Sequence, residues 1–333
     1  LPIELRELRD ADYDIGSLGF SENALLALLG PIARDGLTDA DAVPAPPDEA
    51  ITKPGDLWIL GDHRLLCGDA AKQDDVDRLL NGQAVHLINT DPPYNVRAEP
   101  RSNNAHAIVS SACTGGPYRR IDLLRRPEKA KATHRKMRAK DRPLKNDCIS
   151  DEEYKRLLQA WLDNMARALE PGRGFYIWGG YANGVHYSAM LKAANLYFSQ
   201  MIVWVKEHPA MTCKDFMSNH ELCFYGWKEG AAHQFFGPRN VVDVWSVQKI
   251  NPPQMIHLTE KPVELALRAI QYSSREGECV LDLFGGSGST LIAAEHTGRR
   301  AFLMEIDPLY CDVIVQRWEQ FTGRHAEREG TGR

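Results

Sequence analysis

The feature that most constrains the fold is a short apolar run that ends in two consecutive prolines. The run Val85-His86-Leu87-Ile88 is typical of a buried parallel strand, and Asn89-Thr90-Asp91-Pro92-Pro93-Tyr94-Asn95 follows it directly. Because proline cannot continue a hydrogen-bonded ladder, the strand must stop at Asp91. The sequence therefore predicts a carboxylate, a stiff backbone and an aromatic ring at the carboxyl end of a strand, where open α/β sheets bind their ligands.

These three groups suit a flat ring that carries an amine, such as a nucleobase. The exocyclic amine of a base is a poor nucleophile, because its lone pair is delocalised into the ring. Asp91 and the Pro92 carbonyl can each accept one amine hydrogen, which would localise the lone pair on nitrogen. Tyr94 can stack on the base, a contact worth roughly 1–3 kcal/mol. A Pro-Pro turn with a surface Asp and a packing Tyr is the alternative, which this motif alone does not exclude.

A second motif, far along the chain, favours ligand binding over that alternative. The strand Val280-Leu281-Asp282 is followed by Leu283-Phe284-Gly285-Gly286-Ser287-Gly288-Ser289-Thr290, which opens a helix from about Ser287 to Thr297. Glycines at this position let the backbone approach a ligand closely. A later strand, Ala301-Phe302-Leu303-Met304, ends at Glu305, where an acidic residue can bind both hydroxyls of a ribose.

A glycine-containing turn after a strand occurs in more than one class of nucleotide-binding protein. A dinucleotide-binding unit is disfavoured here, because Leu291 stands where a third glycine would be expected and no hydride-transfer site is evident. Together, the two motifs resemble the DNA amino-methyltransferases that use S-adenosylmethionine. Asp91-Pro92-Pro93-Tyr94 is similar to that family's catalytic motif, and the Asp282 to Thr290 stretch is similar to its cofactor loop. The catalytic motif precedes the cofactor loop, as in the β-class circular permutation.

The resemblance extends over about Asp56 to Thr322. It implies an α/β fold with a Rossmann-like doubly wound methyltransferase sheet in circularly permuted order. The alternation of strands and helices along the chain independently indicates a mostly parallel sheet with helices on both faces. We expect the strand ending at Asp282 to lie beside the strand ending at Asp91, so that a crevice forms where their connections leave in opposite directions.

The resemblance also implies which residues form the site. Asp69 would contact the adenine amine of the cofactor, although it can equally cap the helix expected from about Gln73 to Leu80. Thr259 and Lys261, in a Thr-x-Lys-Pro segment, would border the methionine end of the cofactor, with a bare capped helix start as the alternative. The implied catalytic residues are Asp91, Pro92, Pro93 and Tyr94. The implied cofactor-binding residues are Asp69, Ala70, Asp91, Thr259, Lys261, Asp282, Phe284, Gly286, Ser287, Gly288, Ser289, Glu305 and Ile306.

The segment from Arg97 to Lys145 differs from the rest of the chain in its charge. It contains 14 Lys and Arg against 4 Asp and Glu, whereas the whole chain has a formal net charge of −5. Because this basic insertion directly follows the catalytic motif, we expect it to contact nucleic-acid phosphates rather than to form an ordinary solvated face. It would also take part in target recognition, since only about 30 residues separate Trp227 from His257, where β-class enzymes usually carry their recognition region. The predicted nucleic-acid contacts are Arg97, Arg101, Lys129, Lys131, Arg135, Lys136, Arg138 and Lys140.

We divide the 333 residues into three parts. Residues 1–50 form an N-terminal helical extension and linker that resembles the tail of a ParB-like segment, and a helical appendage with only a packing role is the alternative. Residues 51–322 form the methyltransferase catalytic domain, with the basic insertion at about 97–145. Residues 323–333 form a polar tail.

Cysteine usage and hydropathy indicate a cytoplasmic protein, in a prokaryotic or phage context. Seven dispersed cysteines with no C-x-x-C pair indicate reduced thiols, and no apolar run reaches 18 residues, so no membrane contact is expected. His208, Cys213, His220 and Cys223 match no standard zinc spacing, so no metal is expected either.

The sequence therefore predicts a site-specific methyltransferase that modifies the N6 amine of an adenine flipped out of double-stranded DNA. An Asp before Pro-Pro-Tyr favours adenine, and a cytosine-N4 enzyme is the alternative, with RNA a lower choice. From another class, the chain could be a DNA-binding regulator without catalysis, which the intact Asp91, Tyr94 and Glu305 disfavour. A homodimer is expected from the family alone.

Overall fold

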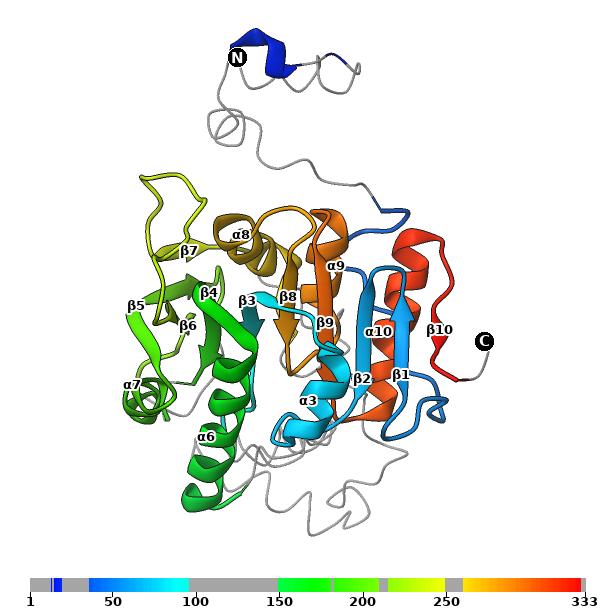
Figure 1. Cartoon of the computed structure of the whole chain (residues 1–333), viewed down its shortest axis with the longest axis horizontal. Coiled ribbons are helices and arrows are strands. Elements are labelled where there is room, and N and C mark those ends of the chain that lie inside the picture. Colours follow the sequence, from blue (N-terminus) through cyan, green and yellow to red (C-terminus); the bar gives the residue numbers. More distant parts are fainter. Residues whose placement is uncertain are drawn as a thin grey trace, which may run out of the picture.

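A ten-stranded sheet forms the centre of the computed structural model, which describes residues 13, 15–19, 36–95, 149–180, 183–209, 215–248 and 260–330. The strands are β1 (Leu57–Leu60), β2 (His63–Cys67), β3 (Val85–Thr90), β4 (Leu169–Gly179), β5 (Leu196–Val205), β6 (His220–Lys228), β7 (Val244–Ser246), β8 (Cys279–Asp282), β9 (Arg300–Glu305) and β10 (Glu327–Arg328). The helices are α3 (Gln73–Leu80), α6 (Asp151–Ala168), α7 (Gly184–Ala193), α8 (Val263–Ser273), α9 (Ser289–His296) and α10 (Pro308–Thr322), with a 3₁₀ turn at Ile15–Leu18. The strand order is β10-β1-β2-β9-β8-β3-β4-β6-β5-β7 (Figure 1).

The five strands at the middle of the sheet are parallel. β2, β9, β8, β3 and β4 pair in parallel with one another, whereas β6 is antiparallel to both β4 and β5. All four residues of β8 are buried, as a parallel strand covered on both faces requires. The prediction of a parallel sheet is thus confirmed for its centre, and antiparallel strands extend it on either side.

Two hydrophobic clusters show that helices cover both faces of the sheet. One cluster contains Leu265, Ile292 and Ile314 from α8, α9 and α10. The other contains Val76 and Leu158 from α3 and α6, together with residues of α7. This three-layer arrangement is the one expected for a doubly wound α/β protein.

Local signals place the ends of the helices. Ser150 caps α6 by accepting a hydrogen bond from the backbone N–H of Glu153 at 3.2 Å. Asp307 caps α10 in the same way, with Pro308 in its first turn. Gly288 precedes α9 with a φ of 85°, a left-handed conformation that favours glycine.

The strands β3 and β8 are parallel neighbours in the sheet, and the order in which strands are added reverses between them. The register pairs Leu87 with Val280 and Ile88 with Leu281. From β8 the chain passes through α9 to β9 on one side, and from β3 it reaches α6 and then β4 on the other. The predicted adjacency of these two strands is confirmed, and it creates a switch point at their carboxyl ends.

Residues 36–54, which we call the linker segment, lie against the helices of the catalytic body. The backbone N–H of Leu37 donates to the Phe321 carbonyl at 2.8 Å, and those of Ile51 and Thr52 donate to the Asp312 carboxylate at 2.7 and 3.1 Å. At the other end of the chain, the expected polar tail contributes β10, which pairs with β1. Within the described residues, no helix has the length and apolar character needed to cross a membrane.

Candidate active site

A cleft opens at the switch point between β3 and β8, with a volume of about 1090 Å³ including its mouth. One wall is the turn after β3, and the opposite wall is the loop between β8 and α9. The end of β9 and the start of α8 complete the lining. The predicted site residues that line the cleft are Asp91, Pro92, Pro93, Tyr94, Lys261, Asp282, Phe284, Gly286, Ser287, Ser289, Glu305 and Ile306.

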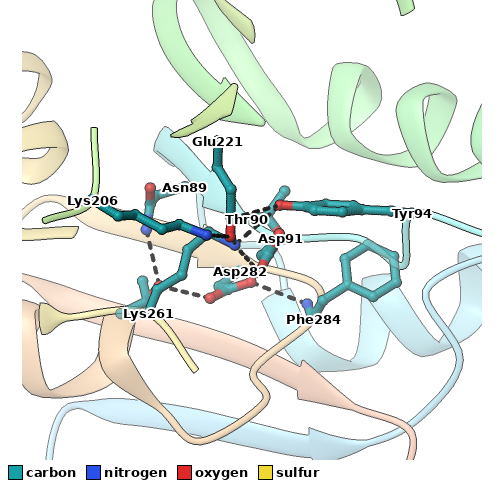
Figure 2. Close-up of polar contacts among 10 residues, drawn as sticks. Asn89, Thr90, Asp91, Tyr94, Lys206, Glu221, Lys261, Asp282 and Phe284 are labelled. Carbon is teal, nitrogen blue, oxygen red and sulfur yellow. Dashed lines mark hydrogen bonds and ion pairs between the residues drawn. The ribbon is translucent and has the colours of Figure 1, made fainter. Parts of the chain in front are cut away.

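The carboxylate of Asp282 ties the two walls together. It accepts hydrogen bonds from the hydroxyls of Thr90 on β3 and Thr290 on α9, at 2.7 and 2.6 Å, and from the backbone N–H of Phe284 at 3.0 Å. The side-chain amide of Asn89 donates to the Thr290 hydroxyl at 3.0 Å (Figure 2). Burial raises the pKa of Asp282 to about 7, although these three donors oppose the shift.

Glu305 organises the loop after β8 from the end of the neighbouring strand. Its two carboxylate oxygens accept the backbone N–H groups of Gly286 and Asp307, at 2.8 and 2.9 Å. Burial raises the pKa of this carboxyl to about 7 as well. Gly286 has a φ of 54°, so its backbone turns toward the carboxylate in a conformation that a side chain would strain.

A buried arginine supports the same loop from behind. Arg317 on α10 donates to the Ser287 carbonyl at 2.8 Å and to the Ala40 carbonyl of the linker segment at 2.6 Å. Burial lowers its pKa to about 10, so the guanidinium remains charged at neutral pH. Arg317 thus joins the linker segment to the wall of the cleft.

Asp91 lies at the opposite wall, and its partner is Lys261. The Lys261 ammonium contacts Asp91 Oδ2, lies 3.2 Å from Glu221 Oε2 and donates to the Tyr94 hydroxyl at 3.1 Å. Lys206 in turn contacts the other oxygen of Glu221. Figure 2 shows the resulting row of alternating charges, Lys206, Glu221, Lys261 and Asp91.

The pKa values of the two carboxylates in this row, Asp91 and Glu221, shift in opposite directions. Burial raises the pKa of Asp91, and the Lys261 ammonium opposes that shift without cancelling it. Burial also works to raise the pKa of Glu221, but two ammonium groups, those of Lys261 and Lys206, outweigh it and hold the value at about 2. Burial would lower the pKa of Lys261, but Asp91 and Glu221 outweigh it and raise the pKa above its usual value.

One oxygen of Asp91 remains available. Among the described residues, Asp91 Oδ1 is buried and has no hydrogen-bond partner. Buried carboxylate oxygens are normally satisfied, so this atom marks where a donor from a ligand would bind. The Tyr94 ring lies beside it, and its backbone carbonyl accepts from Asn183 at 2.8 Å, which fixes the turn.

Three predicted cofactor contacts, Asp69, Ala70 and Gly288, are not among the residues that line the cleft. Ala70 is buried, and its carbonyl accepts from the Asn164 amide on α6 at 2.9 Å. The Asp69 side chain accepts the backbone N–H of Ala71 at 3.0 Å, and Lys72 holds the N-cap position of α3, so the alternative role of Asp69 as the cap is wrong. Gly288 faces Ile314 rather than the cleft, because its role is to start α9.

Several predicted residues fall outside the described part of the chain. Thr259 is one, and Cys213 of the zinc check is another. Within the described ranges, no group of three or more His, Cys, Asp or Glu side chains is placed to hold a metal ion. The predicted nucleic-acid contacts Arg97, Arg101, Lys129, Lys131, Arg135, Lys136, Arg138 and Lys140 also lie outside the described residues.

The structure adds residues to the site that the sequence did not indicate. Glu221 of β6 contacts Lys261, and Lys206, the residue after β5, contacts Glu221. Thr90 and Thr290 bind Asp282. Glu221 is a charged residue near the start of a mainly apolar strand, but its contact with Lys261 depends on the strand order and not on that pattern. Arg317 gave a signal, because it lies three residues after Ile314 on the buried face of a helix.

Family comparisons agree with this geometry. A family model described as DNA methylase matches residues 85–316. A second model, described as a ParB-methyltransferase HTH domain, matches residues 1–54, which confirms the predicted resemblance of the N-terminal part to a ParB-like segment.

Individual relatives have low sequence identity, but the matches cover half of this chain or more. The Type II methyltransferase M.HpaI of Haemophilus parainfluenzae is 23% identical over 285 residues, which cover 79% of this chain and 76% of that protein. The Type II methyltransferase M2.DpnII of Streptococcus pneumoniae is 26% identical over 185 residues, covering 51% of this chain and 69% of its own length.

Solved structures share the fold. M1.HpyAVI in complex with S-adenosylmethionine superimposes with a TM-score of 0.51 at 19% identity, covering 76% of this chain and 98% of that one. The cytosine-N4-specific PvuII DNA methyltransferase gives a TM-score of 0.53 at 13% identity, covering 81% and 90%. The predicted fold class, an α/β Rossmann-like doubly wound methyltransferase sheet, is confirmed.

Proposed function

The chain belongs to the N6/N4 DNA methylase family, and we propose that it transfers a methyl group from S-adenosylmethionine to the N6 amine of an adenine flipped out of double-stranded DNA. The observation that carries the proposal is the shared cleft. Asp91 of the turn after β3 and Phe284 to Ser287 of the loop after β8 line the same cavity, although about 190 residues separate them.

The residues of the loop after β8 fit S-adenosylmethionine. The Glu305 carboxylate lines the cleft and can accept the two hydroxyls of a ribose, while Gly286 keeps the loop backbone close to it. Phe284 offers a ring edge, held by its T-shaped contact with Trp161 at 4.9 Å between centroids. When bound, S-adenosylmethionine supplies an electrophilic methyl carbon on a sulfonium leaving group.

The acceptors on the opposite wall make the target amine more nucleophilic. Asp91 Oδ1 accepts one amine hydrogen and the Pro92 carbonyl accepts the other, which draws the lone pair out of the ring and onto nitrogen. Tyr94 stacks against the base, and Pro93 keeps the turn stiff. The amine nitrogen gains the methyl group and releases one proton to water or to the Asp91 carboxylate. Positioning supplies most of the acceleration under this proposal.

The DNA contacts are proposed for the basic insertion at about 97–145, where 14 basic side chains can neutralise phosphates. We further propose that residues 51–322 form the catalytic domain in the β-class order and that the protein acts in the cytoplasm. We also propose that the protein forms a homodimer.

Methyl transfer from labelled S-adenosylmethionine to unmethylated plasmid tests the activity. We expect wild-type protein to label the plasmid, and Asp91→Ala to lower the rate by roughly 10²–10⁴-fold, because the amine loses its acceptor. Asp163→Ala, at an exposed position on α6, is the matched control and should label as wild type does. Full activity of Asp91→Ala would remove Asp91 from the mechanism.

Cytosine-N4 methylation is the second candidate, since the cytosine-N4-specific PvuII enzyme shares the fold. Mass spectrometry of nucleosides from the labelled plasmid separates the two. N6-methyladenine is the expected product, and N4-methylcytosine alone would overturn the choice of adenine. Long-read sequencing of DNA from an expressing host then gives the recognition sequence.

A further inference from the structure

The linker segment is anchored on α10 at both of its ends. At one end, Gly36 lies so close to the Phe321 ring that a Cβ on Gly36 would come within 2.1 Å of it. At the other end, the Asp312 carboxylate accepts the backbone N–H groups of Ile51 and Thr52, at 2.7 and 3.1 Å. The middle of the segment lies between these anchors, and two consecutive residues there contact the supports of the cleft.

The first of these residues acts on the cofactor wall. The Ala40 carbonyl accepts from one terminal nitrogen of Arg317 at 2.6 Å, while the other nitrogen donates to the Ser287 carbonyl at 2.8 Å. Arg317 is 2% exposed, so water does not readily replace an acceptor that the guanidinium loses. Ser287 lines the cleft between Gly286 and Gly288, whose freedom of backbone leaves much for an outside contact to fix.

The second residue acts on the amine wall. Asp41 accepts the backbone N–H of Val263, the first residue of α8, at 2.8 Å. Val263 follows Lys261 by two positions, and Lys261 lines the cleft where its ammonium contacts Asp91. One dipeptide of the linker segment therefore supports both walls between which the cofactor would lie.

We propose that docking of the linker segment on α10 and binding of S-adenosylmethionine are coupled, with Arg317 and Asp41 as positioning residues. When the segment leaves α10, both walls lose a support and affinity for the cofactor falls. Because such coupling is reciprocal, bound cofactor holds the segment in place. This inference rests on the proposed function. It connects the N-terminal part of the chain, which matches the ParB-methyltransferase HTH model, to the occupancy of the cofactor site.

A variant that displaces the segment far from the cleft tests the coupling. Gly36→Val places a side chain against the Phe321 ring, which is 3% exposed and has little room to move, and neither residue lines the cleft. We expect its Kd for S-adenosylmethionine, measured by calorimetry, to rise about tenfold, and that of Asp41→Ala to rise about fivefold. Asp48→Ala, at an exposed position of the same segment, is the control and should bind as wild type does.

Steady-state kinetics separate positioning from loss of the fold. If Gly36→Val only lowered the amount of folded protein, kcat would fall and KM for S-adenosylmethionine would not change. Coupling predicts the opposite, a KM that rises about tenfold with kcat at saturating cofactor changed by less than about twofold. Hydrogen exchange of wild type gives the reciprocal measurement. S-adenosylmethionine should slow exchange of the Ile51 and Thr52 amides, which lie on Asp312 and away from the cleft, by a comparable factor.

A wild-type Kd for Gly36→Val, or exchange in the linker segment that S-adenosylmethionine leaves unchanged, would overturn the proposal. If Gly36→Val does not fold, Asp41→Ala and the exchange measurement decide the question by the same criteria. If wild-type protein does not bind S-adenosylmethionine, the proposed function fails and this inference falls with it. If wild type binds it and neither the variants nor the exchange rates respond, only this inference fails.

Discussion

Four carboxylates lie in or next to one cleft, two of them buried and two partly exposed, and they are stabilised in two different ways. Asp282 and Glu305, the loop carboxylates, accept hydrogen bonds from hydroxyl and backbone N–H groups. Asp91 and Glu221, the amine-side carboxylates, pair with the ammonium groups of Lys261 and Lys206.

The difference appears in the pKa values. Neutral donors do not offset burial, so Asp282 and Glu305 have pKa values of about 7. Two ammonium groups do offset it for Glu221, whose pKa is about 2, whereas the single ammonium beside Asp91 leaves the pKa of that carboxyl raised. Neutral donors belong to fixed backbone and short side chains and therefore fix a shape, whereas ammonium groups on long side chains can change partners. Fixed neutral donors thus hold the cofactor wall, and charged pairs hold the amine wall.

The largest expected effect comes from removing the cation of the amine wall. Lys261→Met leaves Asp91 with no ammonium partner, and breaking a buried pair costs about 3–5 kcal/mol of unfolding free energy. The loss should shrink as the pH falls, because Asp91, its pKa already raised by burial, then becomes neutral. Urea titrations at pH 5 and pH 8 measure both. An equal loss at the two pH values would show that Asp91 does not carry the effect.

Removing one hydrogen-bond donor from Asp282 should lower the free energy of unfolding by a smaller amount. Thr90→Val deletes one of the two hydroxyls on Asp282 and should cost about 1–3 kcal/mol, because the buried oxygen is left without that donor. Thr297→Val is the control, since that buried hydroxyl bonds only to carbonyls of its own helix, and it should cost less. If Thr90→Val cost as much as Lys261→Met, the contrast between the walls would not hold.

A binding measurement sharpens the comparison at Glu305. Its folded pKa of about 7 lies above the ordinary value of 4.5, so its contribution to stability is present below pH 4.5 and is lost as the pH rises through 7. Ribose hydroxyls donate to the ionised form, so affinity for S-adenosylmethionine should move the other way and rise about tenfold from pH 6 to pH 8. Calorimetry on wild type and Glu305→Gln tests this, and the same slope in both proteins would assign the proton elsewhere.

The smallest expected effect concerns the backbone that carries Lys261. Asp41 of the linker segment accepts the backbone N–H of Val263 at 2.8 Å, at the start of α8. Asp41→Ala should cost about 1 kcal/mol, the usual value for a lost helix cap. Asp48→Ala, at an exposed position of the same linker segment, is the control. A thermal midpoint for Asp41→Ala equal to that of Asp48→Ala would show that the contact adds nothing.

Sequence reasoning found the residues of both walls but not the ion pairs on the Asp91 side. Prolines after Thr90 and glycines after Asp282 act locally, so the strand ends and the β3–β8 pairing could be predicted. Glu221 could not, because its place depends on β6 running antiparallel between β4 and β5, and nothing in the local pattern specifies that order. Lys261 was predicted to border the cofactor; it lines the cleft, and its ammonium contacts Asp91.

The position of the linker segment has a practical consequence for anyone who wishes to express the catalytic body alone. The match to the N-terminal model ends at residue 54, which invites a cut at that point. Such a truncation would remove Asp41 from the start of α8 and Ala40 from Arg317, and with them two supports on opposite sides of the cleft. A shortened gene should therefore start upstream of Leu37. The end of the N-terminal family match and the start of the segment that packs on the catalytic body are different positions in this protein.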